Sequence, residues 1–459
     1  MNPTLHAILI FLQTWWVELV SGVVIVAVVP LVAGYLVLME RKLMADMQAR
    51  LGPMRVGPHG LLQPIADAFK LLIKEDIIPA DADKLIFWLA PVISMVAALT
   101  AMGAIAFGPA FQVARDINVG ILFVVGVSSL GFLGIILGGW ASNSHYSIIG
   151  AIRSTAQLVS YETAGGLAIV SALLLSGTLS IRGIVDAQQK SGAWFIFLAP
   201  VAFFTYLVAS IAETNRAPFD LPEAESELVA GYMTEYSGFR WALYFLGEYA
   251  NMIVVGSVAT TLFLGGWLRP FPNVHWLNWI EYLPAFFIAI VGVYCIYRAG
   301  KQPVAIQVAF MWAVALACFA IAAVLAAPWI LHVLHKFGVA APLNLDFTVP
   351  GLNGAFWFLL KVSVYIYVFM WLRFTLPRYR FDQLMHLGWY ILIPLAIVNV
   401  LAVGVALLLE SALGWNRWLA MVVTTIITMA FALFLVHLHD KRTAAASSAA
   451  AVTTDSYAG

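Results

Sequence analysis

The chain has 459 residues, of which 62% are hydrophobic and only 10% are charged, with 24 basic residues against 24 acidic ones. Soluble domains carry about a quarter charged residues, so this content is too low to cover a soluble surface of this size. A net charge of zero supplies no basic surface, which excludes nucleic-acid binding as a main activity. The composition therefore predicts a polytopic membrane protein of the all-α class.

The chain has two cysteines, Cys295 and Cys318, both in apolar stretches. They are too few for a disulfide framework, a four-cysteine zinc site or an iron–sulfur cluster. The sequence also lacks a phosphate-binding loop, a zinc-protease motif and a dinucleotide fingerprint. We therefore expect that this chain binds no metal or cofactor itself, and that any redox centre belongs to a partner.

Stretches of about 20 apolar residues, the length that crosses a bilayer as a helix, recur along the chain. Eleven qualify, at about 15–39, 85–107, 117–139, 157–176, 193–212, 241–264, 278–297, 304–331, 355–374, 389–410 and 416–437. We expect one transmembrane domain over residues 1–442, followed by a disordered Ala/Ser/Thr-rich tail over 443–459.

The distribution of Lys and Arg orients these spans, because cytoplasmic loops are enriched in them. If the N-terminus lies outside, most of the 24 basic residues fall on inside segments, including Arg41, Arg373, Arg378 and Lys441. The sequence therefore predicts an outside N-terminus and a cytoplasmic C-terminus.

The first long inside loop, 40–84, contains a helix-like segment over Leu61–Ile78. One side carries Leu61, Ile65, Phe69 and Leu72, and another carries Asp67, Lys70 and Lys74. This spacing predicts an amphipathic helix at the membrane interface. The helix is either an anchor on the lipid surface or one wall of a site that faces both lipid and water.

The second long inside loop, 213–240, concentrates acidic residues beside the membrane. Six of the 24 lie here: Glu213, Asp220, Glu223, Glu225, Glu227 and Glu235. Asp220 and Glu223 also fit a capping box at the start of a helix. Crowded carboxylates repel one another, which raises some of their pKa values and favours proton uptake near neutral pH. A solvated acidic loop is the alternative.

Ionisable residues inside the spans are a stronger indication of function, because burying one costs at least about 2.5 kcal/mol. Glu162 lies in the fourth span, Glu248 in the sixth and Lys361 in the ninth. Both acids lie towards the inside face, so with the acidic loop they predict a proton path into the membrane. A structural ion pair with Arg153 is the alternative for Glu162.

A third inside cluster, LRFTLPRYRFDQLMHLG at 372–388, is basic and contains Arg373, Arg378 and Arg380. By itself it is typical of the positive-inside signal and of contact with lipid headgroups.

Four polar strings together resemble one known family, the H-type subunit of proton-translocating NADH–quinone oxidoreductase, respiratory complex I. They are ERKLMADMQARLGPMRVGPHGLLQPIADAFKLLIKEDIIPADADK, GWASNSHYSIIGAIRSTAQLVSYE, ETNRAPFDLPEAESELVAGYMTEYSG and FTLPRYRFDQLMHLGW. The resemblance covers about 40–268 and 354–400.

The resemblance implies a subunit of the cell inner membrane that forms the membrane side of a quinone chamber and begins a proton path. The implied quinone-binding residues are Arg41, Asp67, Lys70, Arg216, Arg373 and Arg378. The implied proton-coupling residues are Glu162, Glu213, Asp220, Glu223, Glu225, Glu227 and Glu248. Flavin mononucleotide and iron–sulfur clusters would lie in soluble quinone-reducing and iron–sulfur partner subunits. Small membrane-arm subunits, antiporter-like subunits and lipids would be the membrane partners.

The chain is longer than the eight-span core of that family. The core would occupy about 15–268 and 354–410, with two spans inserted at about 278–331 and one added at about 416–437. Two alternatives remain. The chain could be the homologous subunit of a membrane-bound hydrogenase or deazaflavin dehydrogenase, or a stand-alone ion transporter that uses the same carboxylates.

Overall fold

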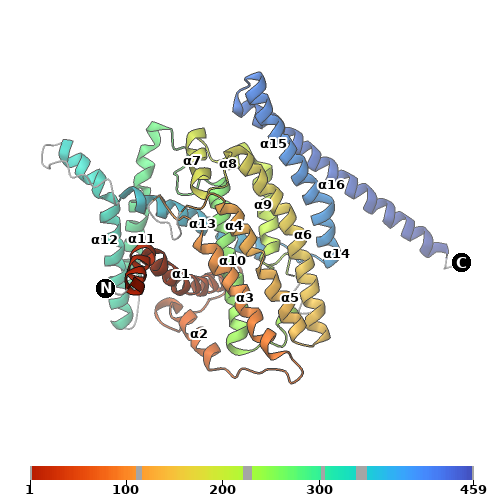
Figure 1. Cartoon of the computed structure of the whole chain (residues 1–459), viewed down its shortest axis with the longest axis horizontal. Coiled ribbons are helices and arrows are strands. Elements are labelled where there is room, and N and C mark those ends of the chain that lie inside the picture. The colour runs from red at the N-terminus through yellow and green to blue at the C-terminus, as the bar shows by residue number, and fades with distance from the viewer. Residues whose placement is uncertain (1–2, 110–115, 221–229, 301–304, 337–348, 457–459) are drawn as a thin grey trace.

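The computed structural model describes residues 3–109, 116–220, 230–300, 305–336 and 349–456, and each regular element among them is a helix (Figure 1). Ten of these described segments are long and apolar enough to cross a membrane. The structure therefore confirms the predicted all-α polytopic class. The remaining predicted span, 193–212, folds as two shorter helices, α8 (Phe195–Leu198) and α9 (Pro200–Glu213). They are separate because Ala199 leaves the helical region and Pro200 has no amide hydrogen to continue α8.

The other elements follow the chain in an order that matches the predicted spans. The first half contains α1 (Pro3–Met47), η1 (Pro58–Gly60), α2 (Gln63–Ile73), α3 (Lys84–Gly103), α4 (Gly120–Ser128), α5 (Gly131–Ala141), α6 (His145–Ser176) and α7 (Ile181–Ser191). After α9 come η2 (Gly231–Met233), α10 (Gly238–Phe263), η3 (His275–Tyr282), α11 (Leu283–Ala299), α12 (Ala305–Lys336), α13 (Val349–Thr375), α14 (Phe381–His386), the π-helical turn η4 (Leu387–Leu392), α15 (Ile393–Leu413) and α16 (Arg417–Ser456).

Helix α10 is the central helix of the bundle. It packs against α1, α3 and α13, and 72% of its apolar span is buried, against 22% for α11 and α12. Several large apolar side chains of α10, among them Tyr244, Leu262 and Phe263, are buried. A polar residue on α10, such as Glu248, is therefore held in the interior by the packing of the whole helix.

Glycines on α5 allow its neighbours to approach closely. A Cβ on Gly139 would lie 2.4 Å from the Cβ of Ala151 on α6, and one on Gly134 would lie 2.6 Å from the carbonyl oxygen of Ala90 on α3. Small residues at helix contacts are how membrane helices achieve close packing. This packing places α6, which carries Glu162, directly against α5.

The three inside clusters predicted from the sequence meet at one end of the bundle, here called the loop end. The amide of Ile77 donates a hydrogen bond to Ser237 Oγ (3.0 Å), and Arg240 forms an ion pair with Asp76 (3.0 Å). The amide of Tyr379 donates to the carbonyl oxygen of Pro218 (3.0 Å). In Figure 1, α2 lies at this end and α7 at the opposite one, here called the α7 end.

The predicted amphipathic helix is present as α2, but it is shorter than expected, because the backbone becomes extended at Lys74. The apolar face of α2 is exposed and consists of Ile65, Phe69 and Leu72. At the C-terminus, α16 remains helical to Ser456 where the sequence predicted disorder from residue 443. The physical reason is the run of alanines, which have the highest helix propensity.

Candidate functional site

A break in the third span brings a hydroxyl group to Glu162. Helix α4 ends at Ser128 and α5 begins at Gly131, so Ser129 lies between them. Its Oγ donates a hydrogen bond to a carboxylate oxygen of Glu162 on α6. A hydrogen bond to the charged form of a carboxylate stabilises that form inside a protein. The break in the span therefore provides a polar partner for a carboxylate within the bundle.

Three of the predicted proton-coupling residues line one cavity, here called the carboxylate cavity. Glu162 reaches it from α6, Glu213 from the last residue of α9 and Glu248 from α10. Ser129 and Asn251 also line it, and the cavity has room for more than one water molecule. The three carboxylates therefore share one polar space.

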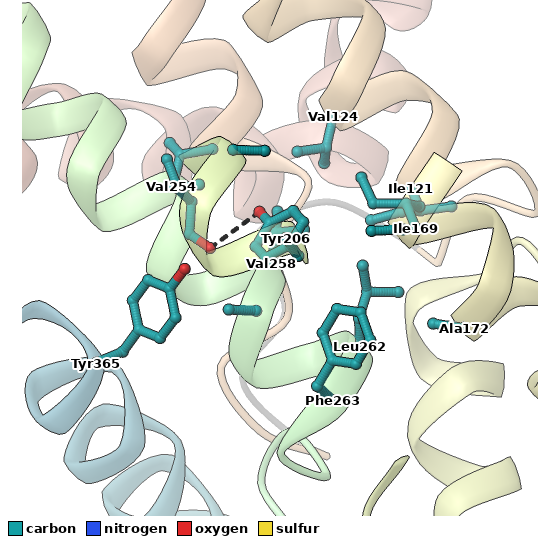
Figure 2. Packing of buried hydrophobic residues seen from close by; sticks show 14 of the residues in the cluster. Ile121, Val124, Ile169, Ala172, Tyr206, Val254, Val258, Leu262, Phe263 and Tyr365 are labelled. Atoms are coloured by element: carbon teal, nitrogen blue, oxygen red, sulfur yellow. Dashed lines mark hydrogen bonds between the residues drawn. The ribbon is translucent and has the colours of Figure 1, made fainter. Parts of the chain in front are cut away.

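A second cavity extends from the first towards the α7 end, here called the apolar cavity. Glu162 and Glu213 line both, whereas the rest of the second cavity is formed mainly by glycines and apolar groups such as Gly165 and Val258. Figure 2 shows the close packing around it, with Tyr206 among side chains of α4, α6, α10 and α13. The Tyr206 hydroxyl donates to the carbonyl oxygen of Val255 (3.2 Å). Among the described residues that line these two cavities, the carboxylates are Glu162 and Glu213, which both cavities share, and Glu248, which lines only the carboxylate cavity.

A chain of contacts links the carboxylate cavity to the end of α1. Arg216 forms a buried ion pair with Glu248 (3.1 Å), and its guanidinium lies 4.2 Å from the centre of the Tyr249 ring. The Tyr249 hydroxyl donates to Glu40 (2.7 Å), and Glu40 is ion-paired with Arg373. Charge-assisted hydrogen bonds of this kind are stronger than neutral ones. The chain of contacts connects the interior of α10 with two segments of the loop end that are far apart in sequence.

A second set of charged groups surrounds α2 at the loop end. Arg41 forms an ion pair with Asp67 (2.8 Å), which also accepts a hydrogen bond from Gln63 (2.9 Å). Lys70 is exposed on the same helix. Together they place polar side chains next to the exposed apolar face of α2, so that this helix presents both kinds of surface.

Most of the predicted site residues that the structure describes form two groups. The structure brings Glu162, Glu213, Glu248 and Arg216 together in the interior, and it brings Arg41, Asp67 and Lys70 together on α1 and α2. Asp220 is buried and pairs with Arg378 (3.5 Å), and it is not among the residues that line the carboxylate cavity. Glu223, Glu225 and Glu227, and with them the predicted capping box, lie outside the described residues.

Sequence reasoning missed Glu40, Tyr249 and Ser129 as site residues. In the sequence, Glu40 directly follows an apolar span and looks like the start of a loop. The available signal was an acidic residue at the end of a span, where burial requires a partner. Neutral Tyr and Ser carry no such signal in an apolar sequence. Their roles follow only from the contacts that the fold creates.

Lys361, the basic residue inside a predicted span, has a structural partner. Its Nζ donates to the carbonyl oxygens of Leu264 (2.6 Å), Gly266 (2.8 Å) and Leu268, and lies 4.3 Å from the centre of the Trp194 ring. These carbonyl groups follow the C-terminal end of α10, where a cation is favoured by unpaired carbonyls and the helix dipole. Lys361 therefore caps the central helix.

The fold and the site define a polytopic helical membrane protein in which ion pairs and hydrogen bonds join a buried carboxylate cavity to charged loops at one end. Within the described part of the chain, no group of His, Cys, Asp and Glu is arranged to hold a metal ion.

Comparison with known proteins identifies the family. The family model described as NADH dehydrogenase matches residues 20–404. The chain is 53% identical to the second H-type subunit of NADH-quinone oxidoreductase from Solibacter usitatus over 384 residues, which is 82% of this chain and 93% of that protein. It is 42% identical to the H-type subunit of NADH-quinone oxidoreductase from Rickettsia prowazekii over 384 residues, which is 83% of this chain and 91% of that protein. The chain therefore belongs to the family of H-type subunits of NADH–quinone oxidoreductase, multi-pass membrane subunits of an oxidoreductase complex. Helix α16 begins beyond the part that the family model matches.

Proposed function

We propose that this chain forms the membrane side of the quinone chamber of NADH–quinone oxidoreductase and holds the first part of its proton-coupling path. The observation that carries the proposal is the unbroken chain of contacts from Arg373 and Glu40, through Tyr249 and Arg216, to Glu248 in the carboxylate cavity. It gives a charge change at the loop end a physical route to the interior carboxylates.

On the quinone side, α2 supplies the exposed apolar face and the end of α1 supplies the charges. The apolar tail of a quinone suits the face that contains Ile65, Phe69 and Leu72, and its polar head suits the neighbouring Arg41 and Asp67. Arg373, which pairs with Glu40, and Arg378 lie at and after the end of α13 and complete the basic side.

Reduction changes the charge on the quinone, and this change is what couples to protons. A negative charge near Arg373 competes with Glu40 for the guanidinium, because unlike charges attract strongly where water is scarce. Glu40 then interacts more strongly with Tyr249 and attracts the nearby Arg216. The ion pair between Arg216 and Glu248 weakens, which raises the proton affinity of the Glu248 carboxylate. Glu213 and Glu162 line the same cavity, so a change in the protonation of Glu248 alters the proton affinity of both.

This chain then needs partners for both the electrons and the pumped protons. Electrons would come from flavin mononucleotide through iron–sulfur clusters of soluble neighbours, because quinone is the substrate and this chain supplies the chamber. Small membrane-arm subunits and antiporter-like subunits would receive the change of protonation, with lipids around the bundle. Affinity purification in mild detergent should recover this chain with iron and flavin, whereas a stand-alone ion transporter would purify without them.

The direct test uses Glu162→Gln and Glu213→Gln in the intact complex. Each variant keeps the size of the side chain but cannot carry a negative charge, so quinone reduction should fall roughly tenfold or more, the scale of a lost proton-transfer group. NADH oxidation by ferricyanide, which bypasses quinone, should not change. Glu410→Gln is the matched control, because Glu410 pairs with Arg417 (3.8 Å) at the other end of the bundle. Normal quinone reduction in both cavity variants would remove the carboxylates from the mechanism.

A further inference from the structure

Helices α11 (Leu283–Ala299) and α12 (Ala305–Lys336) form a hairpin at the edge of the molecule, on the opposite side from α15 and α16 (Figure 1). They pack mainly against each other through a narrow buried cluster of Cys295, Ala299, Met311 and Ala315. The ring of Phe319 lies against the backbone of Gly292 in the same seam. Towards the core, the hairpin contacts α13, where the rings of Phe287 and Phe356 are 6.4 Å apart.

The hairpin also reaches the loop end. Helix α12 contacts η1, the turn at Pro58–Gly60 between α1 and α2. Arg298, near the end of α11, lies close enough to His59 for its charge to act on the imidazole. The pKa of His59 is lowered, first by partial burial and then by the positive charges of Arg298 and Lys42. Geometry and charge therefore both place the end of the hairpin beside this turn.

The contacted turn is tightly constrained and joins the two helices of the proposed quinone site. His59 adopts a positive φ of 53°, and a Cβ on Gly60 would lie 2.2 Å from the carbonyl oxygen of Pro53. The Lys42 ammonium donates to the His59 carbonyl oxygen (2.6 Å), which ties the turn to the end of α1 next to Arg41. A displacement of η1 would therefore move α1 and α2 relative to each other.

The end of the hairpin also has the surface expected at a membrane boundary. Tyr294 and Tyr297 are more than half exposed, and the Arg298 Nε donates to the Tyr294 hydroxyl (2.8 Å). Aromatic residues with a polar tip are enriched where lipid tails meet headgroups. An isoprenoid tail that travels within the bilayer towards α2 would meet side chains of this kind.

We propose that the α11–α12 hairpin is a side wall of the entry by which quinone reaches the site between α1 and α2, and that its inner end holds η1 in position for long-tailed quinones. This inference rests on the proposed function, because it assigns the hairpin to the same quinone site. Arg298 is a positioning residue in this scheme, since it acts on the site through the turn at His59.

The first test compares quinones of different tail length in the intact complex. Arg298→Ala should raise the KM for a quinone with a long isoprenoid tail by roughly two- to fivefold, the scale of one lost exposed charge interaction. The kcat and the KM for a short-tailed quinone should stay within about twofold of wild type, because a short tail does not reach the hairpin and an exposed charge contributes little to stability. Arg298→Lys keeps the charge and should restore most of the affinity. Lys190→Ala is the matched control, because it removes an exposed positive charge from α7, at the opposite end of the bundle.

The second test needs no variant and so does not depend on folding of a mutant. A quinone analogue with a photoreactive group on its tail should label peptides from 283–299 or 305–327 in the wild-type complex. Labelling of other segments of this chain without either hairpin helix, or an unchanged long-tail KM in Arg298→Ala, would overturn the hairpin proposal and leave the quinone site intact. An analogue that labels no part of this chain would instead contradict the proposed function itself.

Discussion

Arg216 and Glu248 form an ion pair in the interior of the bundle, with 3.1 Å between the guanidinium Nη2 and a carboxylate oxygen and with only 4% and 12% of their side chains exposed. The pair joins the acidic loop that follows α9 to the central helix α10. The family resemblance assigns its two members to different roles, Arg216 to quinone binding and Glu248 to proton coupling. Under the proposed function, this contact joins quinone binding and proton coupling in one network.

Removing one member of this pair should destabilise the protein strongly. Arg216→Met leaves the carboxylate of Glu248 without its guanidinium partner, and a broken buried pair typically costs about 3–5 kcal/mol. We expect less assembled complex in membranes and a lower temperature of unfolding, measured on native gels and by thermal denaturation in detergent.

The double variant Arg216→Met with Glu248→Gln distinguishes stability from coupling. It removes the uncompensated charge, so assembly should recover relative to Arg216→Met, whereas quinone reduction should remain low. A double variant with normal quinone reduction would show that the pair serves only the fold.

The Tyr249 hydroxyl is the predicted link between the pair and the end of α1. Tyr249→Phe loses the hydrogen bond to Glu40 (2.7 Å) and retains the ring against Arg216. Loss of a hydrogen bond to a charged group is worth about 1.5–3 kcal/mol, so quinone reduction should fall roughly tenfold or more with unchanged complex content. Tyr236→Phe is the matched control, because its hydroxyl bonds only neutral groups, among them the Gly138 carbonyl oxygen (3.4 Å), Tyr244 and Ser142, and quinone reduction should stay as in wild type.

Lys361 should matter for stability rather than for coupling. Lys361→Met removes the cation that binds three carbonyl groups after α10, with an expected loss on the order of 3 kcal/mol. Thermal denaturation of the complex measures this loss of stability. Lys190→Met is the control, because Lys190 is exposed in the last turn of α7. A variant as stable as wild type would contradict the capping role.

The close contact between α5 and α6 makes a further prediction. Gly139→Ala places a methyl group 2.4 Å from the Cβ of Ala151, so the helices must separate and the position of Glu162 must shift. Overpacking of this kind costs about 1–3 kcal/mol. We expect reduced stability and reduced quinone reduction, whereas Gly126→Ala, with open space around its Cβ, should change neither.

The sequence predicted the helical elements well because lipid demands long apolar helices, and the spans follow directly from composition. It also identified Glu162 and Glu248, because a carboxylate within an apolar span stands out. It did not predict the split at Pro200 or the partners of Lys361, Glu40 and Arg216. These contacts depend on which helices pack against each other, and a single sequence does not show which helices are neighbours.

Proton translocation by the Glu213→Gln complex tests the central claim most directly. The complex would be reconstituted in lipid vesicles, and proton uptake would be recorded with a pH-sensitive dye after addition of NADH and quinone. A coupling role for the carboxylate cavity, which Glu213 shares with Glu162 and Glu248, predicts little or no proton movement at normal complex content, with Glu410→Gln close to wild type. Wild-type proton movement in Glu213→Gln would contradict it.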